Sequence, residues 1–159
     1  MKKFAFAMGL ALMTSACASS LLSVEQPYTG DARYQTANLQ YDESAVPVDQ
    51  DNLEYTAEKM ENALFDGDSP IFSRGDGITI RYRYVGFNEG SRVGRWLTGG
   101  IGGQSKVLLE VDFVDQSGDV VARVRGEGGV GGGLAGGSNK TGIDKAIAEV
   151  AEYAARTFR

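Results

Sequence analysis

Three segments in the second half of the chain alternate apolar and polar residues, and this alternation restricts the possible fold more than any other feature. The segments are Ile78–Val85, Val107–Val114 and Val120–Arg125. Because successive side chains of a strand point to opposite faces, each segment is expected to bury one face and to leave the other in water. That pattern is typical of an antiparallel sheet with one solvated face. The turn residues 115–119 predict a hairpin between the last two strands.

Two helices are expected beside this sheet. The first spans Asn52–Phe65 and begins with a capping-box pattern formed by Asp51 and Glu54. Its apolar stripe is Leu53, Ala57, Met60 and Leu64. The second spans Gly142–Phe158, with the stripe Ile143, Ile147, Val150, Ala154 and Phe158. We therefore predict an α+β domain, in which a small antiparallel meander of three to four strands is packed by two helices.

The N-terminus has the organisation of an export signal. A basic start at residues 1–3 precedes an apolar run at residues 4–13, which is too short to span a bilayer of about 30 Å. Thr14-Ser15-Ala16-Cys17 resembles a lipobox, which implies cleavage after Ala16 and lipid attachment to Cys17. The alternative is an ordinary secretory signal cut nearby, which would leave a soluble mature protein without lipid. Because Cys17 is the chain's only cysteine, and a free thiol is a liability in an oxidising compartment, we favour the lipidated form.

These features divide the chain into three parts: a signal peptide at residues 1–16, a lipidated N-terminus and tether at 17–48, and the α+β domain at 49–159. Residues 18–48 hold Pro27, Gly30 and Pro47 and keep no helical or strand period, so we expect a flexible tether. Its tyrosines could equally pack onto the domain and order part of it.

Composition excludes several chemistries. The chain has 16 basic and 21 acidic residues, and removing residues 1–16 takes away two lysines, so the mature net charge is −7. Such a chain lacks the basic surface of a nucleic-acid-binding protein. With no histidine, it can form neither a Ser-His-Asp triad nor a His-based metal site. We therefore expect no catalytic residue, no metal and no cofactor.

The acidic residues around the predicted hairpin form a further candidate site. Asp112, Asp115 and Asp119 could attract Ca²⁺, but they lack the EF-hand spacing, and we expect them to serve the hairpin instead. Glu110 and Asp112 share a strand face, where we expect them to be solvated.

Glycine is the compositional anomaly, with 22 residues concentrated in two segments. The segment Gly126–Gly142 contains a G-x-G-x-x-G pattern at residues 131–136. The following helix begins several residues too late, and no further strand supplies a ribose-binding acid, so we expect no nucleotide. A closely packed glycine loop, or a strand whose neighbour approaches closely, is the preferred interpretation.

The other glycine-rich segment, residues 86–103, is a connection longer than common loops, and such loops are often functional. It holds the only tryptophan. Arg92, Arg95 and Trp96 would share one side of a helical turn and, with Leu97 and Ile101, form a candidate partner-binding cluster. The alternative is that Trp96, Leu97 and Ile101 fold back onto the open side of the sheet.

Several of these segments together resemble the bacterial family catalogued as domain of unknown function 4410, over residues Leu53–Phe158. The matching residues are Gly90-Ser91, Arg95-Trp96, Gly99–Gly103, Val107–Asp115, Gly118 and Val120–Val124. Members of that family are mostly predicted envelope lipoproteins without an assigned activity, so the resemblance implies a fold and a location but no catalytic residue. Ala18 and Ser19 differ from the aspartate that retains enterobacterial lipoproteins at the inner membrane, which implies sorting to the outer membrane.

The sequence thus predicts a non-enzymatic lipoprotein, held in the outer membrane by the lipid on Cys17 and facing the periplasm. Its domain is predicted to bind another envelope component, a protein in the first instance, through residues 92–103. The alternative is a ligand-binding module for lipid or cell-wall glycan, with Tyr82 and Tyr84 lining a cleft on the sheet.

Overall fold

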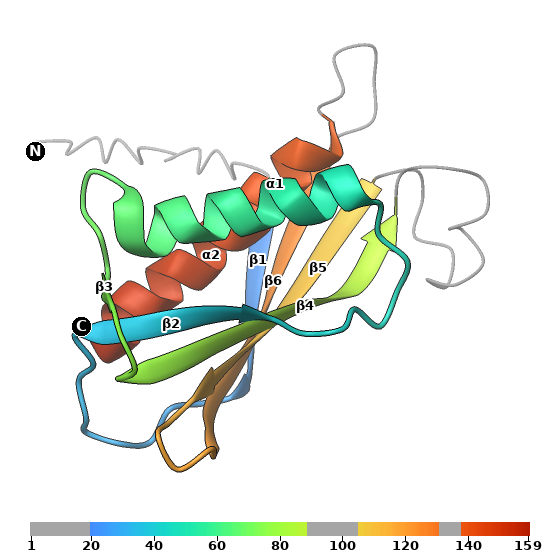
Figure 1. Cartoon of the computed structure of the whole chain (residues 1–159). Helices are drawn as coiled ribbons and strands as arrows, with labels where there is room; N and C mark the ends of the chain where they lie inside the picture. The colour runs from blue at the N-terminus through green and yellow to red at the C-terminus, as the bar shows by residue number, and fades with distance from the viewer. Residues whose placement is uncertain (1–19, 89–104, 131–137) are drawn as a thin grey trace, which may run out of the picture.

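The computed structural model describes residues 20–88, 105–130 and 138–159. These residues form a six-stranded sheet with its two α-helices on the same face (Figure 1). The elements in chain order are β1 (Ser20–Gln26), β2 (Thr36–Tyr41), α1 (Gln50–Glu61), the π-helical turn η1 (Asn62–Asp66), β3 (Ser73–Arg74), β4 (Ile78–Asn88), β5 (Ser105–Val114), β6 (Val120–Val130) and α2 (Asn139–Phe158). The strand order across the sheet is β1-β6-β5-β4-β2-β3.

The predicted small antiparallel meander is wrong, because the sheet is larger and of mixed direction. The three predicted strands are its centre, as antiparallel β4, β5 and β6. β1 adds antiparallel to β6, whereas β2 lies parallel to β4, and β3 lies parallel to β2. β1 and β2 fall in the segment expected to be a flexible tether, so this part of the prediction is also incorrect.

The two missed strands gave no periodic signal for a physical reason. β1 is an edge strand and buries none of its residues fully, and in β2 only Ala37 is buried. Without a continuous buried face, neither strand needs the apolar alternation that marks a central strand. Their positions are fixed by pairing with strands about 40 to 100 residues away, as in Leu22↔Gly126 and Leu39↔Ile80.

The apolar core lies between the sheet and the helices, on the face that the alternation predicted. Its side chains from the three central strands are Ile78, Ile80, Tyr82, Tyr84, Val107, Leu109, Val111, Phe113, Ala122 and Val124, and all are buried. The predicted stripe of α2 is buried against them. Phe158, at the end of α2, contacts the rings of Tyr28, Tyr34, Phe113 and Tyr153, and so fixes the chain between β1 and β2 onto the core.

The first helix begins two residues earlier than predicted, and its predicted stripe is half right, because Met60 and Leu64 are buried whereas Leu53 and Ala57 are not fully buried. Asp49 is its N-cap and accepts a hydrogen bond from the backbone N–H of Asn52 at 3.0 Å. The buried residues of α1 are Asn52, Thr56 and Met60, whereas the predicted stripe residue Leu53 is only partly buried. The hydroxyl of Thr56 is hydrogen-bonded to the hydroxyl of Tyr84. This bond satisfies a polar side chain on the inward face of α1 and the polar end of a buried tyrosine in the core.

Glycines in β6 let α2 approach the sheet closely. A Cβ atom on Gly128 would lie 1.8 Å from the carbonyl oxygen of Gly142, and one on Gly126 would lie 2.5 Å from that of Ala146. The glycines at 126–129 therefore belong to a strand with a close neighbour, one of the two interpretations offered for this segment. Within the described residues, no helix combines the length and apolarity needed to cross a bilayer.

Candidate functional site

The face of the sheet turned away from α1 and α2 (Figure 1) carries an ordered array of charged side chains, which we call the charge lattice. Its centre is β5, whose outward-facing acids Glu110 and Asp112 lie between two arginine-bearing strands. Register places Glu110 opposite Arg83 of β4 and Arg125 of β6, and Asp112 opposite Arg123 of β6. The alternation that buries one face of each strand therefore brings opposite charges together on the other.

Glu110 is the most enclosed member of the charge lattice. Its side chain is 6% exposed, and it accepts hydrogen bonds from Arg83 Nη2 at 2.5 Å and from Arg125 Nη2 at 2.7 Å. Burial raises the pKa of the Glu110 carboxyl, but the hydrogen bonds from Arg125 and Arg83 outweigh that effect and hold the pKa below its ordinary value. Glu110 is therefore ionised at neutral pH, and the two guanidinium groups are held over it.

Further ion pairs extend the charge lattice in both directions. Arg123 binds Asp112 through two nearly parallel contacts of 2.5 and 2.7 Å, a bidentate geometry that fixes the guanidinium plane. Lys106 contacts Glu127 at 2.6 Å toward the far end of the same strands. At the margins, Glu25 lies 3.5 Å from Arg125, and Asp42 lies 4.0 Å from Arg83.

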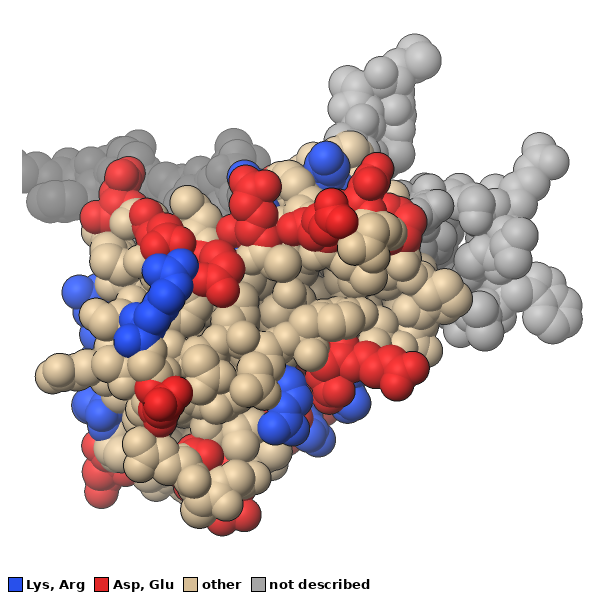
Figure 2. Space-filling model, viewed as in Figure 1, with Lys and Arg blue, Asp and Glu red and all other residues tan. Residues whose placement is uncertain are grey.

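The charge lattice is electrically balanced in an otherwise acidic chain. It holds five basic side chains (Arg81, Arg83, Lys106, Arg123, Arg125) and five acidic ones (Glu25, Asp42, Glu110, Asp112, Glu127). The whole chain has 16 basic and 21 acidic residues, so the excess of acid lies elsewhere. Figure 2 shows part of that excess as acidic side chains gathered along α1, where Asp51, Glu54, Glu58 and Glu61 lie.

The side chains expected to bind a partner lie outside the described residues. This holds for Arg92, Arg95, Trp96, Leu97 and Ile101, for Cys17, and for the pattern at residues 131–136. Their roles stay predictions.

Tyr82 and Tyr84, which the ligand-binding alternative placed in a cleft, lie in the core instead. They are 3% and 0% exposed, and they face the helices rather than the open face of the sheet. Burial raises the pKa of each phenol to about 12, so both stay neutral. Within the described part of the chain, neither tyrosine borders any hollow described below.

The hairpin acids do not converge on one point. Asp112 faces the charge lattice, whereas Asp115 accepts hydrogen bonds from the Ser117 hydroxyl and the Ser117 N–H, at 2.6 and 2.9 Å. Asp119 also accepts from the Ser117 hydroxyl. Among residues 20–88, 105–130 and 138–159, no three His, Cys, Asp or Glu side chains are placed to hold a metal ion.

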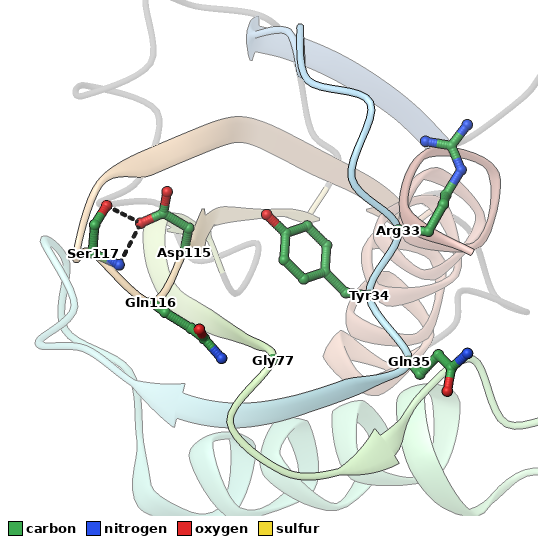
Figure 3. A pocket seen from close by; sticks show the side chains of 7 residues that line it. All are labelled: Arg33, Tyr34, Gln35, Gly77, Asp115, Gln116 and Ser117. Atoms are coloured by element: carbon green, nitrogen blue, oxygen red, sulfur yellow. Dashed lines mark hydrogen bonds between the residues drawn. The ribbon is translucent and has the colours of Figure 1, made fainter.

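A shallow polar hollow of about 370 Å³ lies between this hairpin and the start of β2 (Figure 3). The ring of Tyr34 points into it, and Gly77, Gln116 and Ser117 border it. A second hollow of about 380 Å³ shares Arg33, Tyr34 and Gln35 and reaches Phe158. In the first hollow the Ser117 hydroxyl donates to the Asp115 carboxylate, and the same carboxylate oxygen also accepts the backbone N–H groups of Ser117 and Asp119, so it serves the hairpin turn.

The arginines of the charge lattice were missed by the sequence reasoning, although a signal for them exists. Arg81 and Arg83 are spaced two apart, as are Glu110 with Asp112 and Arg123 with Arg125. Two basic strands flanking an acidic one predict a ladder of ion pairs once the strands are placed side by side. Treating the two acids alone led to the expectation of free solvation, which the structure contradicts.

Comparison with known proteins identifies a similar fold. No protein-family model matches the sequence, and no curated protein sequence matches it either. Among solved structures, the chain is similar to a single-substitution variant of the PelC dodecamer from Paraburkholderia phytofirmans, with a TM-score of 0.53 and 12% identity over 86% of this chain and 98% of that one. The PelC dodecamer in a second crystal form aligns with a TM-score of 0.48 and 12% identity, over 88% of this chain and 99% of that one. At this level of identity, the likeness concerns the fold alone.

Proposed function

We propose that this chain is a lipid-anchored envelope protein without catalytic activity, whose domain associates with further copies of itself through the charge lattice. The anchor would be the acylated Cys17. The observation that carries the proposal is the neutral and largely paired charge lattice on the face of the sheet opposite α1 and α2, in an otherwise acidic chain.

Charge balance favours this face over the helix side for self-association. Two copies meeting through the acidic side of α1 would bring like charges together, and that repulsion opposes contact. Two copies meeting through the charge lattice would each present alternating positive and negative rows, which can be placed in register with opposite charges facing.

Preorganisation also favours the charge lattice. Long charged side chains normally lose conformational freedom when an interface forms, at a cost of about 0.5–1.5 kcal/mol each. Arg83, Arg123 and Arg125 are already held by carboxylates within the chain, with side chains only 36–38% exposed. Arginine in such a fixed plane is a common interface residue. The similar PelC structure is a dodecamer, and this supports further copies of this chain as the first partner to test.

Arg81 offers the sharpest test, because it lies on the charge lattice and has no ion pair of its own within the described residues. It faces Asp112 across β4 and β5. Arg81→Glu would put an acid beside that acid and break the charge balance of the face. Sedimentation velocity over a concentration series should show the wild type in a discrete assembly and Arg81→Glu as a monomer.

Arg156→Glu is the matched control, since it makes the same charge change on the exposed end of α2. It should leave the assembly intact. Thermal unfolding of both variants would verify that each is folded. A wild-type chain that stays monomeric throughout, or an Arg81→Glu chain that assembles as the wild type does, would overturn the proposed interface.

A further inference from the structure

The start of β1 leaves almost no chain between the domain and Cys17. Only Ala18 and Ser19 stand between Cys17 and Ser20, the first residue of β1. Three residue steps reach at most about 11 Å when fully extended. A lipid on Cys17 would therefore hold one particular end of the sheet beside the bilayer surface, and the inference below rests on that proposed anchor.

The strand register shows which end this is. Ser20 pairs with Gly128, close to the last residue of β6, and Ser105 at the start of β5 pairs with Val130. Asn88 at the end of β4 pairs with Lys106. The start of α2 lies at the same end, because the carbonyl of Gly142 packs directly on Gly128. We call this the anchor end.

The opposite end of the sheet carries the β5–β6 hairpin and the hollow drawn in Figure 3. Gln26, the last residue of β1, donates its side-chain N–H to the carbonyl of Val120, the first residue of β6. From Gly128 to Val120 is eight residues of β6, or about 26 Å at about 3.3 Å per residue. We call this the hairpin end.

We infer that the domain stands directly on the lipid surface by its anchor end, with its hairpin end directed into the periplasm. The domain does not move freely about a tether, because β1 is paired with β6 from Ser20 onward. The charge lattice then stands roughly upright from the bilayer. Neighbouring anchored copies can therefore meet through it while every copy keeps its lipid inserted.

Leu21 gives this end an apolar side chain for the surface. It is 63% exposed, the highest value among the large exposed apolar side chains of the described residues, and it follows Cys17 by only four positions. A single exposed leucine is common on proteins. Here its distance from the lipid is fixed by β1, so it would contact the boundary between headgroups and acyl chains.

Fluorescence quenching in vesicles can measure this orientation. Because Cys17 is the chain's only cysteine and would be acylated, an introduced cysteine supplies a single free thiol for a fluorophore. Ser138→Cys labels the anchor end, where the Ser138 side chain makes no cap hydrogen bond, and Gln116→Cys labels the hairpin end. The full-length lipidated proteins are placed in phosphatidylethanolamine–phosphatidylglycerol vesicles containing a lipid with a nitroxide on its headgroup.

The label at Ser138 should be quenched several-fold more strongly than the label at Gln116. As a control, about 12 glycine and serine residues inserted between Ala18 and Ser19 would add a flexible span of about 20 Å. This insertion should reduce the difference between the two labels while the protein still sediments with the vesicles. Equal quenching at both positions of an acylated, vesicle-bound protein would overturn the orientation alone. A protein whose Cys17 carries no lipid would overturn the orientation and the proposed anchor together.

Discussion

Replacing Glu110 by glutamine should reveal how much the charge lattice contributes to stability. The carboxylate accepts three hydrogen bonds from two guanidinium groups, and hydrogen bonds to charged groups contribute about 1.5–3 kcal/mol each when enclosed. Arg83 and Arg125 are more than one-third exposed, so water can replace much of the hydrogen bonding that they lose when the carboxylate is removed. We therefore expect Glu110→Gln to lower the free energy of unfolding by about 2 kcal/mol at pH 7, and Tm by about 8 °C.

The effect should depend on pH with a definite sign. Because the pKa of Glu110 is depressed in the folded state, its contribution is present above the ordinary value of 4.5 and is lost as the pH falls through the folded pKa. The stability difference between wild type and Glu110→Gln should therefore be constant above the ordinary pKa and shrink as the pH is lowered below it. Urea unfolding followed by circular dichroism at a series of pH values measures this difference directly.

Glu58→Gln supplies the control, because it makes the same chemical change on an exposed position of α1. It should change the free energy of unfolding by no more than about 0.5 kcal/mol. The proposed contribution of Glu110 is refuted if Glu110→Gln changes the free energy of unfolding as little as this control does. It is also refuted if that change is the same at both ends of the pH range.

Four further substitutions test the packing beneath the charge lattice by urea unfolding. Gly128→Ala should lower the free energy of unfolding by about 3 kcal/mol or more, because its Cβ would lie 1.8 Å from the Gly142 carbonyl oxygen and α2 would have to move. A nearly unchanged free energy would contradict the close approach of α2 to β6. Thr56→Val should lower the free energy of unfolding by about 1–3 kcal/mol, because it leaves the buried Tyr84 hydroxyl without its acceptor. Tyr84→Phe should lower it by less, because the Thr56 hydroxyl still donates to the Asn52 carbonyl. The double variant should lose less than the sum of the two, and strict additivity would exclude the hydrogen bond between the hydroxyls. Phe158→Ala should lower the free energy of unfolding by about 3–5 kcal/mol and should expose the segment between β1 and β2 to protease. An unchanged digestion pattern would show that contacts other than those of Phe158 hold this segment on the core.

The parts of the fold that were predictable have a local signature. The strands at 78–88, 105–114 and 120–130 each bury one continuous face, so apolar and polar residues alternate along each of them in the sequence. The helices were found for the same reason, although the first half of the stripe predicted for α1 was wrong. Its inward residues Asn52 and Thr56 are polar, and the Tyr84 hydroxyl opposite makes that side of the helix favourable in the core.

The parts that were missed depend on partners distant in sequence. β1 and β2 look like a tether because they bury little and acquire their conformation by pairing with β6 and β4. The glycines of β6 resemble a phosphate-binding loop until α2 is placed over them. The charge lattice was missed because its acids and arginines lie on separate strands and meet only across the register.

Mass spectrometry of the mature protein, extracted from the membranes of cells that make the full chain, tests the lipid anchor on which both the function and the orientation depend. We predict an N-terminus that begins at Cys17 and carries a diacylglyceryl group, and we predict that Cys17→Ser releases the protein from the membrane fraction. A mature N-terminus at any other residue, or an unmodified Cys17 thiol, would contradict the account.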